Sequence, residues 1–174
     1  MSIKKIITVP DQVLRKISDP IEKVGEHEQK LIDDLFETMY HSNGIGLAAI
    51  QIGIPKRIIV LDVSSKDEQK NPLCFINPVI KKKSENFSSY EEGCLSIPDT
   101  FIEIERPSTC DVEYVDYEGK KRLIKCEGLL STCIQHEIAH CDGELIIDYL
   151  SKLKKDMVIK KLSKQKNNPD RIVV

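Results

Sequence analysis

Two histidines and a glutamate stand close together in the last third of this 174-residue chain, in the segment QHEIAH at 135–140. His136 and His140 are four positions apart, so on a helix their side chains lie about 40° apart and can converge on one point. Glu137 lies about 100° round the helix from His136, beside the pair. This HExxH pattern is typical of two metal-binding imidazoles with a carboxylate that exchanges protons with the activated water. The alternative is an ordinary amphipathic helix, because the pattern also arises by chance.

The residues around the motif indicate that this helix is buried. Over 129–141 the only ionisable side chains besides the two histidines and Glu137 are cysteines. Burying three polar groups without partners would cost several kcal/mol. A metal ion would supply the missing partner, which favours the metal-site interpretation.

A catalytic metal site needs a third protein ligand and an open position. Glu144 and Asp148 follow the motif, and no histidine lies beyond His140. Upstream, Cys94 lies in EEGCLSIP (91–98), where a preceding glycine and polar neighbours indicate a turn rather than the middle of a strand. The residues alone leave these ligands open, together with the possibility that Cys94 is a turn cysteine without chemistry.

The elements that must position these residues follow from apolar spacing and β-branched runs. The expected helices cover 11–17, 25–40, 129–141 and 145–165. The expected strands cover 57–63, 74–80, 101–106, 110–117 and 121–127. The last helix carries one predicted apolar stripe, made of Ile146, Leu150, Leu153 and Met157.

Glycine and proline mark the irregular parts of the pattern. The Gly-rich segment 42–55 predicts a shaped loop, and 64–72 predicts a polar loop. Pro78 predicts a sheet edge or a bulge. Glu118-Gly119 predicts a hairpin turn, and Gly143 is expected to end the helix that carries the motif.

The fold class that accommodates all of this is α+β. We expect one domain over 1–174, with mostly antiparallel or mixed β-sheets packed around a buried HExxH helix and with a C-terminal helix. No repeat or second composition zone divides the chain. We expect a flexible tail at about 167–174.

Composition excludes several classes of function. The chain has 26 Lys+Arg against 28 Asp+Glu, and its near-neutral charge argues against DNA binding by the whole fold. It lacks a run of about 18 apolar residues, so we expect no membrane span. The first ten residues, MSIKKIITVP, do not resemble a secretory signal. We therefore expect a cytoplasmic protein whose six cysteines are mostly buried apolar residues without disulfides.

Three segments stand in a characteristic order: GIGLAAIQ (44–51), EGCLS (92–96) and QHEIAHCDG (135–143). In this order and separation they resemble the three signature motifs of peptide deformylases, and the resemblance covers essentially the whole chain. It implies a metal-dependent amidohydrolase acting on linear amides. Such an enzyme removes the formyl group from the N-terminal formylmethionine of nascent polypeptides and releases formate.

The resemblance also implies roles for individual residues. The implied ligands of one divalent metal ion are Cys94, His136 and His140. Fe²⁺ is the family's usual ion, and Zn²⁺, Ni²⁺ or Co²⁺ can substitute, which suits a thiolate and two imidazoles. Glu137 is implied as the general acid and base, and Gln51 with the backbone N–H of Leu95 is implied to hold the developing oxyanion.

The implied substrate-binding residues surround the methionine. Gly46 matches a backbone contact to the peptide, where the absence of a side chain permits close approach. Ile45, Leu129 and Cys133 match positions that line the methionine pocket, although simple core packing explains them equally well.

Four positions depart from the usual family pattern. Asn43 and Phe101 stand where many relatives have an acidic residue and an arginine, so contacts at the rim of the site can differ. Ala139 stands where aspartate or another polar residue is common, and Cys141 where leucine is usual. We expect Cys141 to be a small apolar substitute that points away from the metal, rather than an alternative ligand.

Two further functions remain as alternatives. A HExxH metallopeptidase would take its third ligand downstream of the motif. A non-catalytic, metal-stabilised module could dock on ribosomes, but it would not need Gln51, Leu95 and Glu137. The segment 151–166, with seven lysines and one acid, is either a solvated helix face or a contact to ribosomal RNA.

Overall fold

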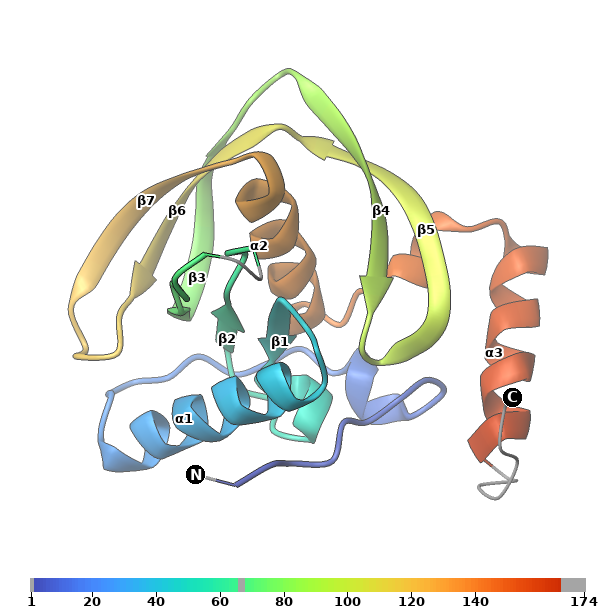
Figure 1. Cartoon of the computed structure of the whole chain (residues 1–174), viewed down its shortest axis with the longest axis horizontal. Coiled ribbons are helices and arrows are strands. Elements are labelled where there is room, and N and C mark those ends of the chain that lie inside the picture. The colour runs from blue at the N-terminus through green and yellow to red at the C-terminus, as the bar shows by residue number, and fades with distance from the viewer. Residues whose placement is uncertain (1, 66–67, 167–174) are drawn as a thin grey trace.

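A computed structural model describes residues 2–65 and 68–166 (Figure 1). The helices are α1 (Glu26–His41), α2 (Gly128–Cys141) and α3 (Lys152–Lys166), with 3₁₀ turns η1 (Gln12–Arg15), η2 (Ala49–Ile52) and η3 (Ile146–Tyr149). The strands are β1 (Gly46–Ala48), β2 (Ile58–Leu61), β3 (Leu73–Lys83), β4 (Phe87–Cys94), β5 (Ile97–Pro107), β6 (Thr109–Val115) and β7 (Lys121–Glu127). The expected tail at 167–174 lies outside the described residues. Within the described part, each helix is too short or too polar to span a membrane.

The strands form two antiparallel sheets. Five strands pair in the order β1-β2-β3-β6-β7, while β4 and β5 form a separate hairpin. Figure 1 shows α2 enclosed between the two sheets, α1 below them, and α3 outside, beyond β5. The α+β class and the buried HExxH helix are therefore confirmed.

Helix α2 is held from several sides. Ten of its 14 residues are buried. Its apolar side chains Ile134 and Ile138 pack in one cluster with Phe75 of β3 and Val112 of β6. Gly143 follows the helix with a φ of 76°, and a Cβ there would lie 2.6 Å from the carbonyl oxygen of Arg15. The predicted end of the helix at Gly143 is confirmed, because only a residue without a side chain fits this close turn.

The single long helix expected at 145–165 is wrong. The chain forms η3, then runs extended at Leu150 (φ −86°, ψ 154°), and only then begins α3. Leu153 and Met157 of the predicted stripe are exposed, whereas Leu162 of α3 is buried. The apolar residues before and after Leu150 therefore belong to two different elements.

The shaped loop expected at 42–55 contains regular structure. Gly46 of β1 pairs with Leu61 of β2, and η2 follows directly. The 3₁₀ turn ends at Gly53, whose φ of 86° reverses the chain. A strand this short carries too few residues to show an alternating pattern.

Strand β4 was not predicted, and β3 contains Pro78 in a sheet interior. Polar residues predominate in β4 and Glu92 is its one buried residue, so its sequence lacks the apolar alternation of a half-buried strand. Pro78 is tolerated because the β3–β6 register shifts between Ile76 and Val79, which confirms the bulge rather than the edge.

The helix expected at 11–17 is the shorter turn η1.

Candidate metal centre

Cys94, His136 and His140 converge on one point. One ligand atom from each lies within 4.8 Å of the others. The Sγ atom of Cys94 is 3.2 Å from Nε2 of His140, and the two imidazole centroids are 5.0 Å apart. Cys94 ends β4, and the two-residue turn Leu95-Ser96 leads into β5. The hairpin thus brings the thiol to the helix that carries both histidines.

The downstream alternatives for a third ligand lie elsewhere. Asp148 accepts hydrogen bonds from Arg15 and pairs with Lys155. Glu144 does not belong to the group of potential metal ligands found among the described residues. The geometry therefore favours Cys94 over both acids.

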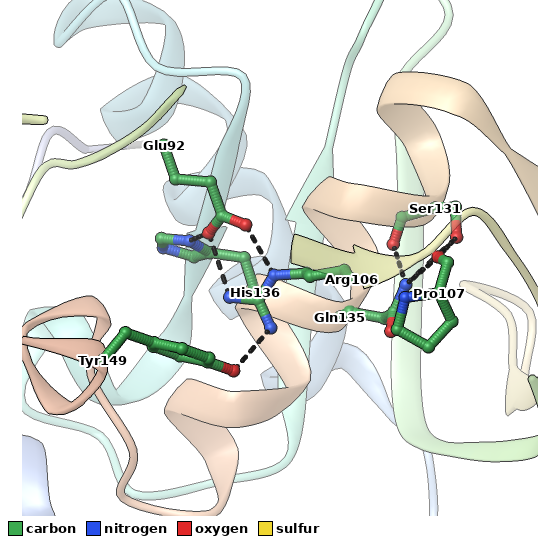
Figure 2. A network of polar contacts seen from close by, with 7 residues as sticks. All are labelled: Glu92, Arg106, Pro107, Ser131, Gln135, His136 and Tyr149. Carbon is green, nitrogen blue, oxygen red and sulfur yellow. Dashed lines mark hydrogen bonds and ion pairs between the residues drawn. The ribbon is translucent and has the colours of Figure 1, made fainter. Parts of the chain in front are cut away.

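A buried carboxylate orients His136. Nδ1 of His136 lies 2.8 Å from Oε2 of Glu92, and Arg106 donates two hydrogen bonds to the same carboxylate (Figure 2). Burial raises the pKa of Glu92, but its hydrogen bonds with His136 and Arg106 outweigh this and hold the pKa below the ordinary value. Because an ionised carboxylate only accepts, His136 donates its Nδ1–H to Glu92, which leaves Nε2 as the ring nitrogen that would bind a metal.

Sequence reasoning missed both Glu92 and Arg106. Glu92 is the first residue of the EGCLS motif, two positions before Cys94. Arg106 follows Ile102 and Ile104 at the same alternating spacing along β5, and all three residues are buried. An arginine on the buried face of a strand is a signal that a buried acidic partner exists.

Helix α2 is also fixed at the residue before His136. The Gln135 Nε2 donates to the carbonyl oxygen of Pro107 at 2.9 Å, and the Ser131 hydroxyl donates to the same oxygen at 3.2 Å (Figure 2). Pro107 follows Arg106 directly. Two adjacent residues of β5 therefore set both the position of the helix and the orientation of its first histidine.

His140 lies deeper than His136. Burial lowers the pKa of His140 well below its ordinary value, and the neighbouring His136 lowers it further. Its Nδ1 has no hydrogen-bond partner in the described part of the chain. The imidazole is therefore neutral, which is the form that binds a metal ion.

Glu137 has a buried carboxyl group with an unpaired oxygen atom. Its Oε2 lacks a hydrogen-bond partner among the described residues, and burial raises its pKa to about 7. Gly46 lies next to it, because a Cβ added there would be 2.5 Å from Oε1 of Glu137. A carboxyl group with a pKa near neutrality can both take up and return a proton.

Gln51 holds its amide beside the thiol of Cys94. Its Oε1 accepts from the backbone N–H of Ala48 at 2.8 Å, and its Nε2 donates to the hydroxyl of Ser96 at 3.0 Å. The same Nε2 is 3.7 Å from Sγ of Cys94. The side chain is almost fully buried, so the amide has one orientation.

A cavity of about 450 Å³ opens onto this group. The lining includes the sequence-predicted residues Ile45, Gly46, Gln51, Cys94, Leu95, Leu129, Cys133, His136 and Glu137. His140 does not line it and lies behind the other two potential ligands. The structure therefore brings all ten predicted site residues into one place.

The four departures fall in different surroundings. Asn43 and Phe101 line the cavity, whereas Ala139 borders a separate small space behind the histidines. Cys141 is fully buried in the cluster with Ile134 and Ile138, and burial raises the pKa of its thiol to about 12. The prediction that Cys141 packs as a small apolar residue is confirmed.

Comparison with known proteins places this site in a family. The family model described as "Polypeptide deformylase" matches residues 3–156. The chain belongs to the polypeptide deformylase family. It is 62% identical over 174 residues, the whole of both chains, to a peptide deformylase from Pelagibacter ubique, and 57% identical to that of Rhizobium meliloti over 94% of each.

Solved structures of the family have the same fold. The crystal structure of peptide deformylase from Ehrlichia chaffeensis superposes with a TM-score of 0.92 at 42% identity, covering 97% of this chain and 99% of that one. A second structure of that enzyme, in complex with actinonin, gives 0.91 at 44% identity over 95% and 98%. The protein is therefore an enzyme of the deformylase family, whose members depend on a metal ion.

Proposed function

We propose that this enzyme hydrolyses the formyl group from the formylmethionine at the start of nascent polypeptides in the cytoplasm, and releases formate. The observation that carries the proposal is the convergence of Cys94, His136 and His140 beside Glu137 at one cavity. Family membership supports the substrate class, because the relatives are peptide deformylases.

The donor set fits one divalent metal ion. A thiolate with two neutral imidazoles suits Fe²⁺, Zn²⁺, Ni²⁺ or Co²⁺ and does not suit Mg²⁺ or Ca²⁺. We take Fe²⁺ as the native ion. When bound by Cys94, His136 and His140, the ion supplies a Lewis acid and lowers the pKa of water to near neutrality.

The protein's own groups then perform the proton transfers. Glu137 takes the proton from the attacking water as the oxygen approaches the formyl carbonyl carbon. The Gln51 amide and the backbone N–H of Leu95 donate to the oxyanion that develops on the carbonyl oxygen. Glu137 returns the proton to the leaving amine, which departs as the free N-terminus of methionine.

The cavity positions the rest of the substrate. Leu129 and Cys133 of α2 and Ile45 before β1 offer apolar surface to the methionine side chain. The absence of a side chain at Gly46 lets the peptide backbone approach Glu137 closely.

Formate release tests the proposal directly. Anaerobically purified enzyme should release formate from formyl-Met-Ala-Ser, and Glu137→Ala should release essentially none while still binding the metal. Absence of turnover with iron, nickel and cobalt each supplied would refute the assignment. Cleavage of the Met-Ala bond instead would identify a peptidase.

Ribosome contact through α3 stays a prediction. Lys154, Lys160 and Lys161 are exposed on α3, and Lys155 is partly engaged with Asp148. A cationic helix face attracts RNA phosphates without specificity. Glutamate substitutions at these lysines should abolish co-sedimentation with ribosomes and leave formate release from tripeptides unchanged. Unchanged co-sedimentation would show that the helix is only a solvated face.

A further inference from the structure

Two cysteines stand directly opposite each other on neighbouring strands, away from the metal ligands. In the register of β6 and β7, Cys110 pairs with Cys126. Both are free thiols, and they are 2% and 0% exposed. Cys74 and Cys94 also lie in strands, but valine and isoleucine stand opposite them. Among the described strands, Cys110 and Cys126 are therefore the one pair of thiols in direct register.

This register brings the two residues within reach of a disulfide bond. Directly opposite residues of antiparallel strands have Cα atoms about 4.5–5.5 Å apart, which lies within the roughly 4.4–6.8 Å that disulfides span. Their Cβ atoms are about 4.5–5.5 Å apart, whereas a disulfide needs roughly 3.5–4.5 Å. The strands must therefore approach each other slightly when the bond forms. A disulfide under such strain is easily reduced again.

The surroundings give the two thiols different roles. The hydrogen bond between them lowers the pKa of the Cys110 thiol and raises that of Cys126. The Ser131 hydroxyl of α2 also donates to Sγ of Cys110, at 3.6 Å. Cys110 is therefore the thiol that ionises, and Cys126 stays protonated beside it. A thiolate next to a second thiol is the arrangement of an attacking and a resolving sulfur.

The position of β7 gives a small oxidant access to these buried sulfurs. β7 is the last strand in the order β1-β2-β3-β6-β7 and lies at the outer side of the sheet in Figure 1. A strand at a sheet edge is held by one neighbour only, so it opens locally more readily than a central strand. Hydrogen peroxide is little larger than water and can reach the pair during such openings.

We propose that Cys110 and Cys126 form a peroxide-reactive dithiol that closes to a reversible disulfide. The Cys110 thiolate attacks one oxygen of the peroxide, so an S–O bond forms, the O–O bond breaks and hydroxide leaves to take up a proton. The Cys126 sulfur then attacks the Cys110 sulfur. The S–S bond forms as the S–O bond breaks, and the departing hydroxide leaves as water with the thiol proton of Cys126. The two thiols lose two electrons, which reduce the peroxide to two waters.

Closure of the disulfide acts on the beginning of α2. Cys126 is two residues before Gly128, where α2 begins, and the Cys110 sulfur that turns to Cys126 moves away from Ser131. Cys133 of the same helix lines the cavity. A shift of about 1 Å near reacting groups can cost about 100-fold in rate, so for the smaller shift here we expect formate release to fall by roughly tenfold while the metal stays bound. This step alone rests on the proposed function.

Peptide mapping tests the disulfide without relying on activity. Nickel-loaded enzyme is treated with hydrogen peroxide, because Ni²⁺ is not oxidised by peroxide as Fe²⁺ is, and the remaining thiols are alkylated. Cleavage after glutamate places each of the six cysteines in a separate peptide, with Cys110 in 106–113 and Cys126 in 119–127. We expect these two peptides to be linked, and dithiothreitol to separate them. Unlinked peptides, or a link from either one to another cysteine, would overturn the proposal.

Cysteine variants test the coupling to α2. Oxidised wild type should release formate about tenfold more slowly with its nickel content unchanged, and dithiothreitol should restore the rate. Cys126→Ser should keep its rate after the same treatment. Cys74→Ser, a control on β3, should form the link and slow down as wild type does. An equal loss of rate in Cys126→Ser, or a linked wild type that keeps its rate, would overturn the coupling.

The two proposals fail in different ways. Reduced, metal-loaded enzyme that releases no formate would refute the proposed function, while the peptide map would still decide whether the disulfide forms. The map of the wild-type enzyme also decides this if Cys126→Ser does not fold.

Discussion

Arg106 holds the carboxylate of Glu92 with two hydrogen bonds, from Nε to Oε1 at 2.5 Å and from Nη2 to Oε2 at 2.9 Å. Both side chains are buried, and Oε2 also contacts Nδ1 of His136. The fork geometry of the guanidinium fixes the plane of the carboxylate, which in turn fixes the imidazole. Tyr149 extends this hydrogen-bond network, because Arg106 Nη1 donates to the Tyr149 hydroxyl at 3.3 Å.

Arg106→Lys should weaken metal binding. A lysine keeps the positive charge but cannot form the fork, so Glu92 and His136 lose their fixed orientation. We expect metal affinity to fall by about 10- to 100-fold, as is typical when the partner of a ligating histidine is disturbed. The metal dissociation rate in the presence of a chelator measures this without relying on activity.

An exposed arginine provides the matched control for that change. Arg122 forms an ion pair with Asp116 through Nε at 2.7 Å, far along β7 from the metal ligands. Arg122→Lys should leave metal dissociation unchanged, since exposed ion pairs contribute little. Equal dissociation rates for wild type and Arg106→Lys would show that Arg106 does not position His136.

Glu137→Gln should separate metal binding from proton transfer. The amide has the shape of the carboxyl group but cannot accept a proton from water. We expect formate release to fall by about 10²- to 10⁴-fold, the usual contribution of a general acid and base. Metal content, measured by elemental analysis, should remain at the wild-type level. A variant that lost its metal instead would place Glu137 among the groups that hold the site together.

The sequence could reveal the parts of the site that depend on local spacing. His136, Glu137 and His140 lie on one helix, so their mutual arrangement follows from the helical period. The contacts of Glu92 with Arg106 could not be read in this way, because they depend on how β4 folds back on β5. The polar character of β4 concealed that strand altogether.

Gly46→Ala should damage activity more than stability. The added Cβ would lie 2.5 Å from Glu137 Oε1 and 2.8 Å from Leu61 Cδ2, so Glu137 must move. A shift of about 1 Å at a reacting group can cost roughly 100-fold in rate, while overpacking costs about 1–3 kcal/mol of stability. Gly25→Ala is the control, because its nearest contact would be 3.4 Å away. Formate release and thermal unfolding of both variants distinguish these effects, and an active Gly46→Ala would contradict the close approach.

Asp148 should make stability depend on pH in the acidic range. Burial raises the pKa of its carboxyl group, but hydrogen bonds from Arg15 and Lys155 outweigh this and hold the pKa well below the ordinary value of 3.8. A lowered native pKa stabilises the fold above the unfolded pKa and ceases to do so as the pH falls towards the native one. Because these side chains are about one-third exposed, we expect about 1 kcal/mol. Wild type should therefore exceed Asp148→Asn by this amount in urea unfolding at pH 7, and the difference should shrink between about pH 5 and pH 3. A difference that stays constant over this range would show that the ion pairs do not carry the effect.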